Sequence, residues 1–293
     1  MFYSVKLFLR GEIMFDLNGM VVLITGGTRG IGKGIAVLLA KEGAIVYFTG
    51  RTEKEFQGAV KLSGSIQVTE KEISLAGGIG YGIRCDHEDD TQTQMVIDKV
   101  ISEQGKIDIL VNNVWGGYEF YNNGTEFWKE KGFWTAPISR FDKMFNSGVR
   151  AHYVTTLFTV PHMINQGCGL IINLSFWSAE RNDMGVAYGM AKSATNKMTE
   201  TMAYELKEYG ISVITIYPGL VRTESVMKAS EYFDLSNSES TEFTGFAIAA
   251  LASDVNIQTK SGTKQTAAQI ANDYGYKDID GKQPTPLDIL TCK

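Results

Sequence analysis

The chain has 293 residues, of which 44% are hydrophobic and 21% charged, and its formal net charge is −5. This composition supports a sizeable core, and the mild negative charge argues against a broad nucleic-acid surface. The three cysteines and three histidines are scattered without metal-ligand or redox spacing, so we expect no metal site and a reducing compartment. No stretch approaches the roughly 18 apolar residues that span a bilayer, which favours a cytoplasmic protein.

The first residues form a short apolar segment. Residues 2–9 contain one lysine and are too short for a secretory signal, and no convincing cleavage site follows them. We interpret residues 1–13 as a loosely held N-terminal extension, with membrane attachment through residues 2–9 as the alternative. The domain is then expected to occupy residues 14–293.

A strand, a glycine turn and a helix follow one another near the N-terminus. Residues 20–25 are a continuous β-branched run typical of a buried parallel strand, and a helical pattern begins at Ile35. A turn of this kind brings the backbone close to a pyrophosphate, and the helix N-terminus supplies N–H groups for it. A plain glycine turn is the alternative. The candidate cofactor-binding residues of this segment are Gly26, Thr28, Arg29, Gly30, Ile31 and Gly32.

The next strand, residues 45–49, indicates which dinucleotide binds. An acidic residue at its end would bind the ribose 2′-hydroxyl of NAD, whereas a basic residue can pair with the 2′-phosphate of NADP. Here Arg51 follows the neutral Gly50, and Arg29 adds a second cation. The two arginines favour NADP(H), although either could be an ordinary solvated side chain.

Apolar runs and amphipathic segments alternate along the rest of the chain. Further strands are predicted at 79–85, 107–112, 170–174, 211–217 and 262–266, and helices at 53–76, 91–104, 139–166, 188–209 and 246–253. This alternation predicts βαβ units, and therefore a single α/β domain with a doubly wound parallel sheet and helices on both faces.

Two loops are candidates for the substrate pocket. Residues 114–138 contain three of the four tryptophans without any regular period, so we expect a loop whose aromatic side chains, Trp115 among them, line an apolar pocket. Trp177 lies close to this pocket in our interpretation. Core packing of the aromatic residues is the alternative. Residues 220–245 are polar and are interpreted as a substrate flap.

The pair Tyr188 and Lys192 carries the candidate chemistry. Residues four apart lie on one face of a helix, so the ammonium group favours the phenolate form of the tyrosine. A tyrosine that ionises more easily, with the Ser175 hydroxyl nearby to hold a substrate oxygen, is a candidate general acid/base. The alternative is a buried tyrosine beside a solvated lysine.

The joint pattern of these motifs resembles the short-chain dehydrogenase/reductase family. It comprises Thr25-Gly26 to Gly32, Asn112-Asn113, Ser175, Tyr188 with Lys192, and Pro218-Gly219, in the family's order over residues 14–267. The resemblance implies a Rossmann-like sheet of about seven strands.

The resemblance also implies residue roles. Ser175 would position the carbonyl oxygen, Tyr188 would exchange the proton, and Lys192 would bind the nicotinamide ribose. The further cofactor contacts that it implies are Asp86 at the adenine, Ile31 and Asn113 along the site, and Pro218, Gly219, Val221 and Thr223 towards the carboxamide.

One position departs from the family pattern. Where the family usually has an active-site asparagine that holds a water molecule behind the lysine, this chain has Gly148. Asn146 is two residues away and would point elsewhere on a helix. The departure leaves the proton relay open. Ser178 is an alternative to Ser175 with poorer spacing.

The expected function is NADPH-dependent reduction of apolar ketones or aldehydes. An enoyl reductase is disfavoured because the related enzymes place the lysine seven residues after the tyrosine rather than four. The other alternative is a weakly catalytic NADP(H) sensor or interaction protein of the same fold. A stripe of small residues on helix 188–209 is suited to helix packing in a homodimer or homotetramer.

Overall fold

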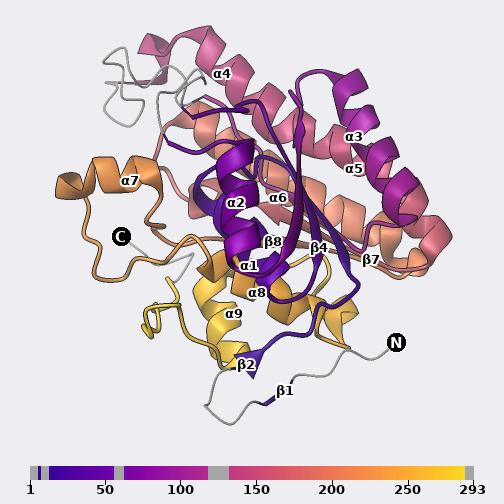
Figure 1. Ribbon diagram of the computed structural model, residues 1–293. Coiled ribbons are helices and arrows are strands. Elements are labelled where there is room, and N and C mark those ends of the chain that lie inside the picture. Colours follow the sequence, from indigo (N-terminus) through magenta and orange to yellow (C-terminus); the bar gives the residue numbers. More distant parts are fainter. Residues whose placement is uncertain (1–5, 8–12, 56–62, 118–131, 288–293) are drawn as a thin grey trace.

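The computed structural model describes residues 6–7, 13–55, 63–117 and 132–287. Its centre is a sheet of seven parallel strands in the order β5-β4-β3-β6-β7-β8-β9 (Figure 1). The predicted doubly wound α/β domain is thereby confirmed. The strands are β3 (Val21–Ile24), β4 (Ile45–Gly50), β5 (Ile79–Arg84), β6 (Ile109–Asn112), β7 (Gly169–Leu174), β8 (Ile211–Tyr217) and β9 (Lys264–Thr266).

Helices cover both faces of this sheet, because parallel strands are apolar on both sides. One face packs against α1 (Gly30–Lys41), α2 (Ile66–Leu75), α8 (Phe243–Ala252) and α9 (Ala267–Tyr274). The other face packs against α3 (Asp90–Gln104), α5 (Ala151–Gln166) and α6 (Val186–Leu206). Because the seven strands are parallel, their carboxyl ends lie at one edge of the sheet. Ligands of α/β proteins bind at this edge.

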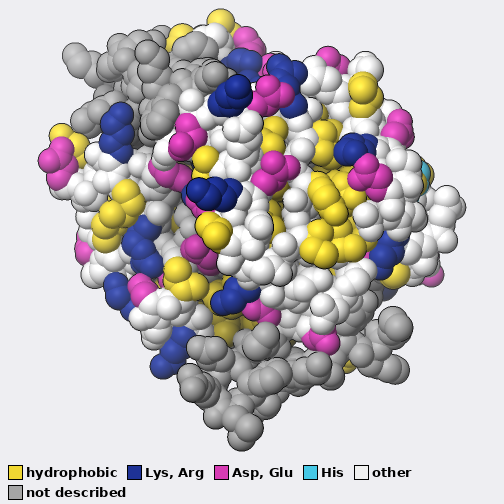
Figure 2. Space-filling model, viewed as in Figure 1, with side chains coloured by type: hydrophobic (Ala, Val, Ile, Leu, Met, Phe, Trp, Pro, Cys, Tyr) yellow, Lys and Arg dark blue, Asp and Glu magenta, His cyan; other side chains and the backbone are white. Residues whose placement is uncertain are grey.

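The next features are the charges on the surface, the length of the apolar helices and the N-terminal segment. On the face shown in Figure 2, basic and acidic side chains are interspersed without a large block of one sign. No described helix is long and apolar enough to cross a membrane. Strands β1 (Lys6–Leu7) and β2 (Ile13–Met14) pair antiparallel, and most of the predicted extension 1–13 lies outside the described residues.

The long helix predicted at 139–166 is present with an internal irregularity. It consists of α4 (Ile138–Phe145), a π-helical turn (Asn146–Arg150) and α5, which follow without a break. The wide turn contains Gly148, the position at which the sequence departs from the family. Single π-turns within helices often mark functional sites.

One helix begins later than the sequence-based prediction, and one further helix is present. Within the predicted helix 53–76, the described part is helical only from Ile66, because the Ser65 hydroxyl accepts a hydrogen bond from the backbone N–H of Val68 and caps α2 there. The helix α9 was not predicted. It begins at Ala267, where the Thr266 hydroxyl accepts a hydrogen bond from the Gln269 N–H in the same way.

The two halves of the predicted flap 220–245 differ in their burial. Its first half contains the short helix α7 (Glu224–Lys228), which lies at the periphery of the molecule (Figure 1). From residue 238 the chain is buried, and α8 begins at Phe243 rather than at residue 246. Glu239 forms a parallel bridge with Val221, which ties this stretch to the end of β8.

The C-terminal tail fixes the buried half of this segment. The Asp278 carboxylate accepts hydrogen bonds from the backbone N–H and the hydroxyl of Ser240, and from Arg222 at 3.3 Å. Arg222 also donates to Asp280, at 3.1 Å. Because Asp278 is itself buried, its charge is compensated inside the protein by these donors.

Candidate active site

The glycine turn is held by one side chain from the neighbouring strand. The Asn113 amide group donates to the backbone oxygens of Thr25 at 2.9 Å and Gly26 at 2.8 Å. A Cβ atom at Gly32 would lie 2.2 Å from the Gly26 oxygen, so only glycine allows the first turn of α1 to approach this closely. Gly30 has φ +54°, a left-handed conformation that favours glycine. The turn thus forms a backbone cradle at the helix N-terminus.

A carboxylate already lies at that N-terminus. The Gly30 N–H donates to Glu224 Oε2 at 2.9 Å, and Lys33 Nζ lies 3.4 Å from Glu224 Oε1 and 3.1 Å from Glu72 Oε1. Burial opposes the charge on Lys33, but the two carboxylates outweigh it and raise the pKa of the ammonium group. The arrangement shows that this end of α1 accepts an anion.

The two predicted arginines lie close enough to influence each other. The Arg29 guanidinium donates to Thr52 Oγ1 at 3.2 Å and to the Gly64 oxygen at 3.3 Å. Its pKa is lowered chiefly by burial; the charge of Glu224 opposes this shift, and the charge of Arg51 adds to it. Arg51 lies 3.9 Å from Asp86, the predicted adenine contact. The two arginines therefore share a corner at the end of β4, where the carboxylates of Glu224 and Asp86 also interact with them.

The predicted Thr28 lies beside this corner. A Cβ atom at Gly50 would lie 2.2 Å from Thr28 Cγ2, so the threonine side chain packs directly over the end of β4. Ile31, the next predicted contact, is partly buried and packs against the core on the α1 side of the sheet. Both residues belong to the same turn as the glycine cradle.

Ser175 directly follows strand β7 and contacts the helix that contains Tyr188. The Ser175 hydroxyl is buried and donates to the backbone oxygen of Lys192 at 3.1 Å. The alternative serine, Ser178, donates instead to Asp183 at 2.6 Å, which engages its hydroxyl in a local turn. The geometry therefore favours Ser175 as the serine next to the candidate catalytic pair.

Lys192 is buried beside two aromatic rings. Its ammonium nitrogen lies 3.7 Å from the ring centroid of Trp115 and 5.5 Å from that of Tyr188. Burial lowers the pKa of this ammonium group to about 7. Among the described residues no carboxylate pairs with it, so cation–π contacts are its main compensation. The predicted solvated lysine, the alternative interpretation, does not fit this burial.

Trp115 fills the space created by Gly148. A Cβ atom at Gly148 would lie 2.4 Å from the Trp115 ring, so no side chain can occupy this position of the π-turn. The Trp115 ring also packs edge-on against Tyr188, with 5.2 Å between the centroids. The sequence departure therefore exchanges a small polar side chain for an aromatic wall beside the lysine.

His152 is a residue near the site that sequence reasoning missed. It follows Gly148 by four residues, so helical spacing alone could have placed both on one face. Its Nε2 donates to the Val114 oxygen at 2.9 Å, and no described group bonds its buried Nδ1. Burial, assisted by the charge of Lys192, lowers the pKa of His152 to about 3. It is therefore a neutral imidazole at physiological pH.

The segment after β8 approaches the glycine turn. A Cβ atom at Gly30 would lie 3.3 Å from Thr223 Cγ2, and the Thr223 hydroxyl caps α7 by accepting a hydrogen bond from the Val226 N–H. Val221 is buried, and Gly219 donates to Glu239. The predicted contacts from Pro218 to Thr223 thus lie in a segment that reaches the N-terminus of α1.

Only part of the predicted aromatic loop 114–138 can be placed. Residues 118–131 lie outside the described residues, while Phe133 and Trp134 are 64% and 74% exposed. Trp115 is the described tryptophan of this loop that lies at the site, beside Lys192. Trp177 instead lines a cavity together with Gly219 and Leu220.

These features fit a nicotinamide dinucleotide. The glycine cradle leaves the backbone accessible to a pyrophosphate, and the N-terminus of α1 already binds a carboxylate. The Lys192 ammonium group, buried without a carboxylate among the described residues, is suited to the ribose hydroxyls of such a cofactor.

A family model described as short chain dehydrogenase matches residues 20–232. The chain belongs to the short-chain dehydrogenase family. It is therefore a member of a family of oxidoreductases that act on CH–OH groups with a nicotinamide cofactor. The resemblance inferred from the motifs is confirmed.

Curated relatives support this assignment. Dehydrogenase/reductase SDR family member 1 of Mus musculus is 34% identical over 280 residues, which cover 91% of this chain and 85% of the relative. The 7alpha-hydroxysteroid dehydrogenase of Clostridium sardiniense is 32% identical over 216 residues, covering 73% and 76% of the two chains.

Solved structures agree with the fold. A short chain dehydrogenase from Mycobacterium thermoresistibile superposes with a TM-score of 0.77 at 26% identity and covers 94% of each chain. A 7α-hydroxysteroid dehydrogenase in complex with NADH and 7-oxoglycochenodeoxycholic acid superposes with a TM-score of 0.69 at 25% identity, covering 86% of this chain and 93% of the other.

We predict that Glu224→Gln tightens cofactor binding by about three- to tenfold. The carboxylate of Glu224 competes with a phosphate for the Gly30 N–H and repels its negative charge, and a neutral amide removes the repulsion. Titration of NADPH by fluorescence measures the dissociation constant. Glu231→Gln, an exposed charge change in the same segment, is the control. Weaker binding to Glu224→Gln would show that the carboxylate assists rather than competes.

Proposed function

We propose that this protein is an NADPH-dependent carbonyl reductase that acts on apolar ketones or aldehydes, with Tyr188 as the general acid. The observation that carries this proposal is the buried ammonium group of Lys192, which lies against the rings of Trp115 and Tyr188 without a carboxylate partner among the described residues. A desolvated cation beside a phenol favours the phenolate that remains after proton donation.

The roles of the three residues follow from their surroundings. The bound cofactor would supply the hydride to the carbonyl carbon. Ser175 turns its hydroxyl from the Lys192 backbone oxygen to the substrate oxygen and holds it, and Tyr188 donates its phenolic proton to that oxygen. Lys192 stabilises the resulting phenolate and orients the cofactor ribose.

We infer the class of substrate from the side chains that line the site. Trp115 offers an aromatic face next to Tyr188, which suits an apolar body better than a charged one. Relatives named as hydroxysteroid dehydrogenases support an apolar ring system as substrate.

We predict that Tyr188→Phe lowers kcat about 10²- to 10⁴-fold while the affinity for NADPH changes little, because the ring is kept and only the proton donor is lost. NADPH oxidation is measured with a panel of apolar ketones, aldehydes and quinones. Tyr204→Phe, on the same helix but 84% exposed, should retain full activity. If the native protein binds NADPH tightly but reduces no carbonyl of the panel, the proposal of a reductase is refuted. A cofactor sensor would then be the better interpretation.

The preference for NADP(H) is proposed from the two arginines at the end of β4. Arg29 and Arg51 lie close enough for each to affect the other, and a 2′-phosphate between them would relieve that repulsion. The Arg51 guanidinium lies 3.9 Å from Asp86, and its planar set of N–H donors matches the oxygens of a phosphate.

We predict that Arg51→Ala weakens NADPH binding about tenfold and leaves NADH binding nearly unchanged, since one charge-assisted contact is worth roughly 1.5 kcal/mol. Both dissociation constants are measured by fluorescence titration. Lys99→Ala removes an exposed cation on α3 and serves as the control. An equal loss for both cofactors would contradict recognition of the 2′-phosphate by Arg51.

A second copy of this chain is the proposed partner. Helices α5 and α6 form a groove of about 810 Å³ lined largely by apolar side chains, among them Leu157, Met198 and Met202. Tyr153 and Leu157 are about half exposed there. Packing of the same two helices from another copy would bury this surface.

We predict that Leu157→Glu converts a homodimer or homotetramer into smaller species, because a charge in the apolar groove opposes association. Size-exclusion chromatography with light scattering gives the mass. Met95→Glu, a similar change at an exposed methionine of α3, should leave the mass unchanged. Native protein that elutes as a monomer at high concentration would refute the interface.

A further inference from the structure

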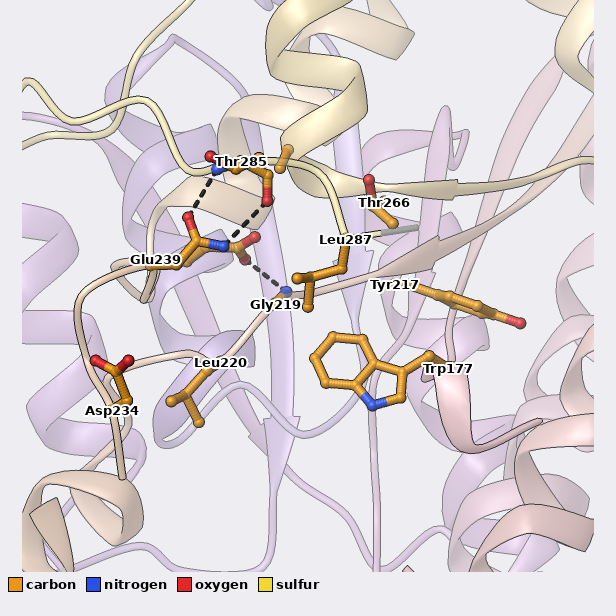
Figure 3. A pocket seen from close by; sticks show the side chains of 11 residues that line it. Trp177, Tyr217, Gly219, Leu220, Asp234, Glu239, Thr266, Thr285 and Leu287 are labelled. Carbon is orange, nitrogen blue, oxygen red and sulfur yellow. Dashed lines mark hydrogen bonds between the residues drawn. The ribbon is translucent and has the colours of Figure 1, made fainter. Parts of the chain in front are cut away.

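A second cavity lies between the end of β8, the flap and the C-terminal tail. It has a volume of about 220 Å³ and apolar walls formed by Trp177, Leu220 and Leu287 (Figure 3). For comparison, an engineered apolar cavity of about 150 Å³ accommodates benzene. The space therefore suits a six-membered ring with one substituent.

Most polar groups around this cavity are already satisfied within the protein. Asn237 and Thr285 bond each other, because the Thr285 N–H donates to Asn237 Oδ1 at 2.7 Å and Asn237 Nδ2 donates to the Thr285 oxygen at 3.1 Å. The Thr266 hydroxyl accepts from the Gln269 N–H at 3.0 Å. Asp234 is exposed at the rim. These groups do not require a ligand.

Glu239 is the exception. Its side chain lines the cavity although the residue is only 2% exposed, and its Oε2 accepts a hydrogen bond from the Gly219 N–H at 2.9 Å (Figure 3). No described group donates to Oε1. Because the Glu239 side chain lines the cavity, a polar group of a ligand that bonds to Oε1 gains a hydrogen bond there.

The protonation state decides which polar group fits. Burial raises the pKa of Glu239 to about 8, and the charge of Asp278 adds to this effect, while the Gly219 hydrogen bond and the charge of Arg222 oppose it. Burial raises the pKa of the nearby Tyr276 phenol, and the charge of Glu239 adds to this effect. The raised pKa favours the neutral carboxyl group, which can donate from Oε1, and this donor is lost as the pH rises through about 8.

We propose that the cavity behind Trp177 binds a six-membered apolar ring that carries a hydroxyl or carbonyl oxygen, and that the Glu239 carboxyl group donates a hydrogen bond to that oxygen. Binding at this site does not depend on hydride transfer, so the proposal stands or fails separately from the proposed reductase activity. The ring could belong to the far end of a carbonyl substrate or to a separate small alcohol, since both present the same chemistry.

The test uses cyclohexanol as a neutral probe and cyclohexylamine as a cationic probe of the same shape. Binding is followed by NMR through the indole N–H of Trp177, which Trp177→Phe assigns. We expect saturable binding of cyclohexanol at pH 6.5 that weakens at least threefold by pH 9.5, and weaker binding of the amine at pH 6.5. No saturable binding of cyclohexanol, or tighter binding of the amine, would overturn the proposal.

Three variants separate recognition from structure. Glu239→Gln keeps an acceptor for Gly219 and a donor for the ligand. This variant should therefore bind cyclohexanol at pH 6.5 with native affinity, and its affinity should not change with pH. Glu239→Met removes the donor and should bind three- to tenfold more weakly at pH 6.5. Asp234→Asn, at the exposed rim, should bind with native affinity and pH dependence. A pH dependence that persists in Glu239→Gln would assign the titration to another group and refute the role of Glu239.

The source of the ring is decided by kinetics. If cyclohexanol inhibits carbonyl reduction competitively and Glu239→Met raises KM without changing kcat, the cavity receives the far end of the substrate. If cyclohexanol binds without affecting KM, the cavity receives a separate small alcohol. Either pattern supports the proposed site. Equal binding of cyclohexanol by the native protein and Glu239→Met would refute it.

Discussion

The arrangement of the site depends on one buried charge. Lys192 carries an ammonium group into the interior, where desolvation lowers its pKa to about 7, and the described residues offer it aromatic faces rather than a carboxylate. A carboxylate partner would fix the charge permanently, whereas a π face compensates it only in part. The lysine is therefore held in place but remains available to other groups, as the proposed orientation of a ribose and stabilisation of a phenolate would require.

The surroundings of this charge are mutually dependent. Gly148 leaves space on the π-turn, Trp115 fills that space, and the filled space gives Lys192 its aromatic contact. One turn further along the same helix, His152 is kept neutral by burial and by the lysine. Gly148 is thus one of several residues that together define the environment of the lysine.

The parts of the fold that sequence reasoning predicted are those encoded locally. The strand, the glycine turn and α1 follow one another within about twenty residues, and the four-residue spacing of Tyr188 and Lys192 places them together on any helix. The buried half of the flap could not be predicted, because its order depends on Asp278, 38 residues after Ser240. His152 reaches the backbone oxygen of Val114 only through tertiary packing, so its place beside the site could not be predicted from composition.

The tie between Ser240 and Asp278 has a consequence for how the chain acquires its structure during synthesis. The glycine turn, its supporting Asn113 and the first strands leave the ribosome early and can form a nucleotide-binding half from contacts already present. The floor of the cavity behind Trp177 is different, since residues 238–240 emerge before the carboxylate that holds them. During that interval Glu239 lacks the burial that raises its pKa, so this shift arises only when the tail packs over residues 238–240.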